Sequence, residues 1–271
     1  MSVFSSSIST AAIIARLRAA GCVFAEDEAE LLLSAAPTPA DLDAMVARRV
    51  AGEPLEHVLG WAEFCGLRVY VEPGVFVPRP RTGFLIEAAV GLAREVAGTP
   101  VVLDLCCGTG AMGAAVAAAL PHAELHAADL DPAAVRCARR NLAGTATVHE
   151  GDLYDPLPAS LRGRVDILIA SPPYVPTESV GLLPPEARLH EPLHALDGGS
   201  DGLDVVRRVI GGAPGWLAPG GWLLVETSER QAAATAEAVR AAGLAVRVAT
   251  SGDLDATAVI GTREDDPDTT A

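Results

Sequence analysis

The stretch Val101-Val102-Leu103-Asp104-Leu105-Cys106-Cys107-Gly108-Thr109-Gly110 decides which fold this chain is expected to adopt. Its first five residues predict a short buried β-strand, because they are nearly all apolar. The glycines that follow mark a turn, and Ala111-Met112-Gly113 begins a helix. A strand, a glycine-rich turn and a helix make up the repeating unit of open α/β sheets.

The chain around this stretch continues the alternation of strand and helix. A helix is expected over residues 83–97. Further strands are expected at 125–128, 146–148, 165–169, 222–225, 244–250 and 256–261. Alternation of this kind predicts an α/β fold, with a mainly parallel sheet and helices on both faces.

The residues before this region predict a separate helical unit. Three short helices are expected between about 8 and 55; Gly21 closes the first, and Leu31, Leu32 and Leu33 supply the apolar face of the second. Thr38 before Pro39 is a start signal for the third. A hairpin turning near Cys65-Gly66 follows. The expected division is a helical domain (1–58), a hairpin linker (59–80), a catalytic domain (81–263) and a flexible tail (264–271).

Composition and charge exclude several classes of protein. Twenty basic and 35 acidic residues give a net charge of −15, which argues against binding to nucleic acid. No apolar run approaches the roughly 20 residues needed to cross a bilayer, and Met1-Ser2-Val3-Phe4 lacks the features of a secretory signal. The odd number of cysteines predicts reduced thiols and a cytoplasmic location. No metal site is expected, because the histidines and cysteines lack ligand spacing.

Acidic residues follow three successive predicted strands, as a nucleoside cofactor would require. The glycine-rich turn, with Asp104, Cys106, Cys107, Gly108, Thr109 and Gly110, is expected to lie against the cofactor. Asp129, followed by Leu130, is the expected acceptor for ribose hydroxyls, whereas Asp131 before Pro132 is expected to cap a helix. Asp152 is the expected acceptor for an adenine amino group, and Leu153 packs on the ring.

The adjacent Cys106 and Cys107 raise the alternative of a redox pair. Small side chains lining a cofactor turn are the simpler interpretation, and it is the one we adopt.

A second motif, Ser171-Pro172-Pro173-Tyr174, follows the strand at 165–169. Consecutive prolines stiffen the backbone and bring no N–H donors. Nearby carbonyls and the Ser171 side chain can therefore hold the hydrogens of an NH2 group, and Tyr174 can stack on a flat target. Holding both N–H bonds would orient a planar nitrogen, which is otherwise a poor nucleophile.

With both motifs in view, the chain resembles the HemK/PrmC family of S-adenosylmethionine-dependent methyltransferases, which modify the glutamine of the Gly-Gly-Gln loop in peptide-chain release factors. The resemblance covers nearly the whole chain and rests on linked segments: Gly52-Glu53-Pro54-Leu55, Gly60-Trp61-Ala62-Glu63-Phe64-Cys65-Gly66-Leu67, Pro73-Gly74-Val75-Phe76-Val77-Pro78-Arg79-Pro80, Glu191-Pro192 and Ala195-Leu196-Asp197-Gly198-Gly199-Ser200-Asp201-Gly202-Leu203-Asp204.

The resemblance implies a Rossmann-like, seven-stranded class I methyltransferase domain behind a helical substrate-binding domain and a hairpin linker. It implies S-adenosylmethionine as cofactor, a release factor or related protein as partner, and Ser171, Pro172, Pro173 and Tyr174 as the catalytic residues. Two departures stand out. The family normally has asparagine where this chain has Ser171, and its acidic residues after Pro80 are replaced in Arg81-Thr82-Gly83.

Other interpretations remain at this stage. The segment 175–202 contains several prolines and little periodicity, and it is expected to form a lid over the target side chain. Ser-Pro-Pro-Tyr also resembles the motif of DNA methyltransferases that modify the cytosine amino group. A small-molecule methyltransferase and a non-catalytic S-adenosylmethionine-binding protein are the further alternatives. The sequence does not indicate an oligomeric state.

Overall fold

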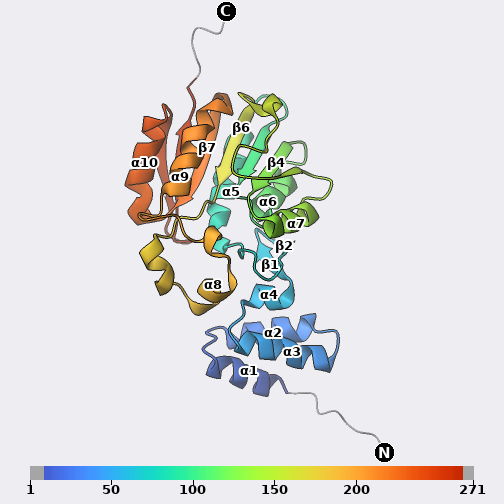
Figure 1. Ribbon diagram of the computed structural model, residues 1–271. Helices are drawn as coiled ribbons and strands as arrows, with labels where there is room; N and C mark the ends of the chain where they lie inside the picture. Colours follow the sequence, from blue (N-terminus) through green and yellow to red (C-terminus); the bar gives the residue numbers. More distant parts are fainter. Residues whose placement is uncertain (1–8, 265–271) are drawn as a thin grey trace, which may run out of the picture.

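The structure, a computed structural model, describes residues 9–264 (Figure 1). The tail predicted for 264–271 lies, apart from Glu264, outside the described residues. Within them, no helix combines the length and apolar character needed to cross a membrane.

From residue 9 to residue 59 the structure has four helices, one more than the sequence predicted. They are α1 (Thr10–Ala19), α2 (Ala25–Ala35), α3 (Pro39–Val50) and the short α4 (Leu55–Leu59). They enclose their own core, which includes Ile13, Leu17 and Leu32. The expected cap at Thr38 is present, since its hydroxyl accepts from the Asp41 amide at 3.2 Å. Leu33 is wrong as a core residue: it lies one residue past Leu32 and turns towards solvent.

A two-stranded hairpin joins the helices to the sheet. Strands β1 (Trp61–Phe64) and β2 (Leu67–Tyr70) are antiparallel. The turn falls at Cys65 and Gly66, as predicted, and both residues have positive φ angles of 49° and 75°. Two-residue hairpin turns of this kind match the twist of the strands they join.

The main sheet has seven strands in the order β5-β4-β3-β6-β7-β9-β8. Their bounds are β3 (Val101–Leu105), β4 (Glu124–Asp129), β5 (Thr147–Glu150), β6 (Val165–Ala170), β7 (Leu217–Thr227), β8 (Ala245–Ser251) and β9 (Ala256–Thr262). The first five are parallel, and β9 pairs antiparallel with β7 and β8. The predicted mainly parallel sheet is confirmed. Strand β7 begins five residues earlier than expected, because it continues through Pro219 and two glycines with a register shift against β6.

Helices cover both faces of this sheet (Figure 1). Helices α5 (Gly83–Ala93), α6 (Ala111–Ala119) and α7 (Pro132–Asn141) lie on one face, and α9 (Asp204–Gly212) and α10 (Ala232–Ala241) on the other. Strand β6 serves both cores, since Ile167 and Ile169 face the first group and Leu168 the second. Short 3-10 turns lie at η1 (Pro80–Thr82), η2 (Ala159–Leu161), η5 (Ala213–Gly215) and η6 (Glu229–Gln231).

The segment 175–202 is more ordered than its sequence suggested. It contains η3 (Thr177–Leu182), α8 (Pro185–His190) and η4 (Leu193–Ala195), and a bridge joins Val175 to Asp197. In Figure 1 it extends from the lower edge of the sheet towards the N-terminal helices.

Candidate active site

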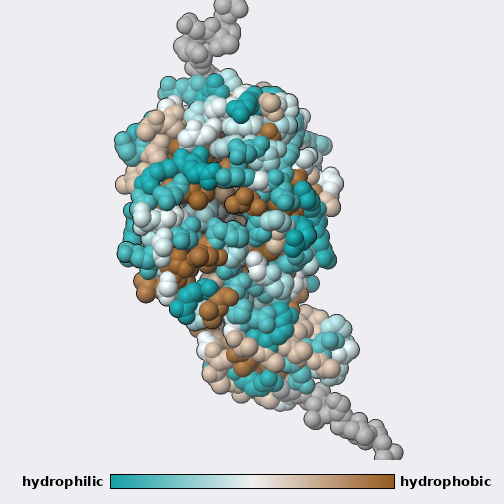
Figure 2. All heavy atoms as spheres, in the orientation of Figure 1, coloured by the Kyte–Doolittle hydropathy of each residue, from teal (hydrophilic) through white to brown (hydrophobic). Residues whose placement is uncertain are grey.

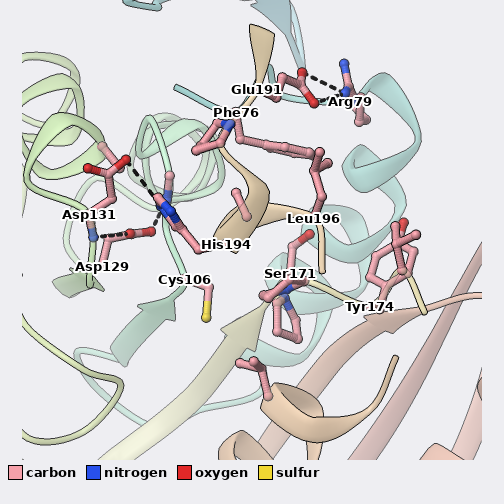
Figure 3. A pocket seen from close by; sticks show the side chains of 18 of the residues that line it. Phe76, Arg79, Cys106, Asp129, Asp131, Ser171, Tyr174, Glu191, His194 and Leu196 are labelled. Atoms are coloured by element: carbon pink, nitrogen blue, oxygen red, sulfur yellow. Dashed lines mark hydrogen bonds and ion pairs between the residues drawn. The ribbon is translucent and has the colours of Figure 1, made fainter. Parts of the chain in front are cut away.

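A pocket of about 420 Å³ opens beyond the carboxyl ends of β3, β4 and β6 (Figure 3). Strand order reverses between β3 and β6, and such switch points are where open α/β sheets bind ligands. Ten of the site residues predicted from the sequence line this one pocket: Cys106, Gly108, Asp129, Leu130, Asp152, Leu153, Ser171, Pro172, Pro173 and Tyr174.

The remaining four, Asp104, Cys107, Thr109 and Gly110, lie behind the pocket wall and do not line it. Gly110 has two structural reasons to be glycine: its φ angle is +75°, and it packs closely against α7. A Cβ there would lie 3.1 Å from the Ala138 Cα and 3.0 Å from Leu142 Cδ1, so glycine is needed for helices α6 and α7 to pack closely.

Asp104 is fully buried beneath the glycine-rich turn. Its Oδ2 accepts from the Gly113 amide at 2.9 Å, whereas Oδ1 has no hydrogen-bond partner. Burial raises the pKa of this carboxyl group to about 8, and the Gly113 bond opposes the rise. An unsatisfied buried carboxyl oxygen has a substantial energetic cost.

Asp129 ends β4 with both oxygens held by backbone amides. Oδ2 accepts from Gly108 at 2.8 Å and Oδ1 from Asp131 at 2.9 Å. Burial raises its pKa, and the two amides oppose that shift. Each oxygen keeps a further lone pair, so the carboxylate can still accept from a ligand. Asp131 caps α7 as predicted, accepting from the Ala133 amide at 2.8 Å.

The carboxylate of Asp152, in the pocket lining, already has a hydrogen-bond partner. Its Oδ2 accepts a hydrogen bond of 2.6 Å from the guanidinium of Arg208, which also lines the pocket. Arg208 lies on α9, and no pattern in the sequence indicated that it would reach this site.

Ser171 and Tyr174 converge on a carboxylate that the sequence analysis did not select, Glu226 at the end of β7. Thr82 and Ser171 each donate to Glu226 Oε2 at 2.8 Å. Tyr174 donates to Oε1 at 3.3 Å, and the Arg81 Nε lies 3.6 Å from that oxygen. Glu226 could have been found, because it follows a predicted strand just as Asp129 and Asp152 do.

The cysteine pair shows no sign of redox chemistry. All five cysteines are free thiols in the structure. Burial raises the pKa of both Cys106 and Cys107 well above the usual value, and the nearby carboxylates act in the same direction. A thiol with a raised pKa is a weak nucleophile at neutral pH.

Two ion pairs hold the segment above the pocket. The carboxylate of Glu191 is buried, accepts from Arg79 at 2.6 Å and also accepts from the Val77 amide. Glu186 on α8 accepts from Arg49 of α3 at 2.8 Å. Both acids therefore make structural contacts.

The outer surface of the same segment is apolar. Leu182, Leu189 and Leu193 are all more than half exposed. Figure 2 shows hydrophobic atoms gathered over this part of the molecule.

The sheet order, the flanking helices and the pocket at the switch point define a class I methyltransferase. The model of the methyltransferase small domain matches residues 68–182. A methyltransferase structure from Pyrococcus furiosus aligns with a TM-score of 0.55 at 18% identity, covering 80% of this chain and 97% of that one, which supports the fold alone.

Curated relatives narrow this class to one family. A release factor glutamine methyltransferase from Geobacter sulfurreducens is 43% identical over 69% of this chain, and the match spans 65% of that protein. Another, from Cereibacter sphaeroides, is 40% identical over 90% of this chain and 92% of its own length. The chain belongs to the release factor glutamine methyltransferase family. A 4-amino-L-phenylalanine/4-methylamino-L-phenylalanine methyltransferase from Streptomyces pristinaespiralis is also similar, 38% identical over 84% of this chain and 78% of that protein.

Proposed function

We propose that the protein transfers a methyl group from S-adenosylmethionine to the side-chain amide nitrogen of a glutamine in a peptide-chain release factor. The observation that carries the proposal is that one pocket joins Asp129 at the end of β4 and Asp152 after β5 to Ser171-Pro172-Pro173-Tyr174. Family membership supports the same substrate, because several similar curated proteins bear that name.

The residues of the pocket fit the cofactor. In the proposed arrangement Asp129 accepts from the ribose hydroxyls, Asp152 from the adenine amino group, and Leu153 packs on the base. Asp104 supports the glycine-rich turn from beneath, through the hydrogen bond that its Oδ2 accepts from the Gly113 amide. The cofactor supplies an electrophilic methyl group on a sulfonium centre.

The chain's own groups would hold the acceptor nitrogen. Pro172 and Pro173 leave neighbouring carbonyls without competing N–H donors, and Ser171 and Tyr174 face the same pocket. Fixing the two N–H bonds places the nitrogen lone pair and limits its motion, which is the main help a protein can give to a weak amide nucleophile. Transfer leaves the amide nitrogen positively charged, and it then loses one of its two protons to water to give the neutral N-methyl amide.

The remaining parts of the chain have roles in partner binding under this proposal. The helical domain (1–58) and the linker (59–80) bind the protein substrate, and the apolar lid segment covers the target side chain above the methyltransferase domain (81–263). The free cysteines agree with a cytoplasmic location.

Transfer of a labelled methyl group into a bacterial lysate tests the class of acceptor. The proposal predicts label in the protein fraction, released by protease and resistant to nuclease. Label released by nuclease would contradict it and favour the nucleic-acid alternative.

A small aromatic amine is the second candidate acceptor. The similarity to the 4-amino-L-phenylalanine enzyme, together with serine in place of the family asparagine, favours testing it. Free 4-amino-L-phenylalanine offered in competition with a release factor separates the two candidates. Preferential methylation of the free amine would replace the proposed substrate.

A further inference from the structure

Three hydroxyl groups beside the Ser171-Pro172-Pro173-Tyr174 motif donate hydrogen bonds to one carboxylate, that of Glu226. Thr82 and Ser171 both lie 2.8 Å from its Oε2, and Tyr174 lies 3.3 Å from its Oε1. The carboxylate itself is buried, with only 5% of the residue exposed. Arg81 approaches Oε1 at 3.6 Å and donates to the Tyr174 hydroxyl at 3.0 Å.

The direction of these hydrogen bonds follows from chemistry. An ionised carboxylate only accepts, so the hydroxyl of Ser171 must donate to it. A serine hydroxyl has one hydrogen and two lone pairs. Once its hydrogen is committed to Glu226, only the lone pairs of Ser171 remain for a group entering the pocket.

We propose that Glu226 is a positioning residue that makes Ser171 a hydrogen-bond acceptor for the N–H of the methyl-accepting nitrogen. Serine alone can either donate or accept, whereas the carbonyl oxygen of an asparagine in this place would always accept. The Ser171–Glu226 pair therefore supplies the acceptor that the family obtains from one side chain. The inference rests on the proposed function only in requiring an acceptor nitrogen that carries hydrogen.

Thr82 and Arg81 complete the arrangement. Thr82 shares Oε2 with Ser171 and so fixes that oxygen towards the serine. Arg81 balances the negative charge from the other side, which limits the cost of keeping a carboxylate buried. Under this proposal Arg81 and Thr82, which replace the acidic residues of the family after Pro80, both support the carboxylate of Glu226.

A double-mutant cycle tests whether Glu226 acts through Ser171. Glu226→Met removes the acceptor, and Glu226→Gln keeps one oxygen that can accept from both hydroxyls. We expect Glu226→Met to lower kcat about tenfold or more and Glu226→Gln to retain most activity. In a Ser171→Ala background, Glu226→Met should cost less than about threefold further. S-adenosylmethionine affinity and melting temperature, measured for every variant, identify general damage.

Equal losses from Glu226→Met in both backgrounds, or loss of activity in Glu226→Gln as large as in Glu226→Met, would overturn the inference. If the wild-type protein does not methylate a release factor, the proposed function fails while the inference is still tested by neutron diffraction of deuterated crystals. A deuteron on Ser171 directed at Glu226 supports it. A deuteron directed into the pocket refutes it.

Discussion

The guanidinium of Arg208 holds the carboxylate of Asp152 at 2.6 Å, at the edge of the pocket proposed for the cofactor. Both side chains are substantially exposed, so the pair adds little to stability. Its consequence is for binding, because the acid proposed to meet the adenine already has a partner on α9.

Asp152→Ala should weaken S-adenosylmethionine binding about tenfold, since it removes a charged acceptor, whereas Arg208→Ala should change the Kd less than about threefold. Calorimetric titration measures both. Asp201→Ala is the matched control, because Asp201 pairs with Arg207 on the same helix without lining the pocket. Unchanged affinity in Asp152→Ala would remove its proposed role.

Asp129→Ala should weaken cofactor binding more strongly than Asp152→Ala, because it removes the ribose acceptors and the bonds that hold the Gly108 and Asp131 amides. Asp166→Ala provides the control. That carboxylate also accepts from a backbone amide, at Val101, but lies outside the pocket. Equal cofactor affinities in Asp129→Ala and Asp166→Ala would show that Asp129 does not contact the cofactor.

Asp104 should make the unliganded protein less stable as pH rises. Its pKa in the folded state, about 8, exceeds the ordinary value of 3.8 for an aspartate, so the folded state binds more protons between these values. The free energy of unfolding therefore falls as pH increases through this window. Asp104→Asn removes this pH dependence of stability. The melting temperature of the variant minus that of the wild type should therefore increase from pH 5 to pH 8. A difference in melting temperature that stays the same at every pH would show that Asp104 does not titrate in this range in the folded protein.

Arg79→Ala should destabilise the protein by about 1–3 kcal/mol, because it leaves the buried carboxylate of Glu191 without the hydrogen bonds of its cation. Burial already raises the pKa of Glu191, and losing Arg79 raises it further. The stability deficit should therefore grow as pH rises above the ordinary glutamate pKa. Denaturant titration at pH 5 and pH 8 measures it. Adding Glu191→Gln should recover part of the loss, and no recovery would exclude the pair as the cause.

The sequence predicted most of the architecture because periodicity and glycine-rich turns are local signals. The strand ending at Leu105, the cap at Asp131 and the turn at Cys65 all depend on neighbours in the chain. The same signals predicted that Asp129 and Asp152 gather at one edge of the sheet, since parallel strands bring their carboxyl ends together.

Long-range contacts account for what the sequence analysis missed. Arg208 reaches Asp152 from 56 residues away, and Thr82 meets Glu226 across 144. Gly110 shows a related limit, because its close packing against α7 adds a long-range reason for glycine to the positive φ angle that the turn imposes. Such contacts depend on how α9, η1 and β7 are placed by the whole fold.

The most direct test of the proposed function is mass mapping of a purified bacterial release factor after incubation with this protein and S-adenosylmethionine. We predict a single added methyl group, located by fragmentation on the glutamine of the Gly-Gly-Gln loop and absent when that glutamine is replaced by alanine. A methyl group on another residue, or an unmodified release factor in the presence of a protein that demonstrably binds the cofactor, would contradict it.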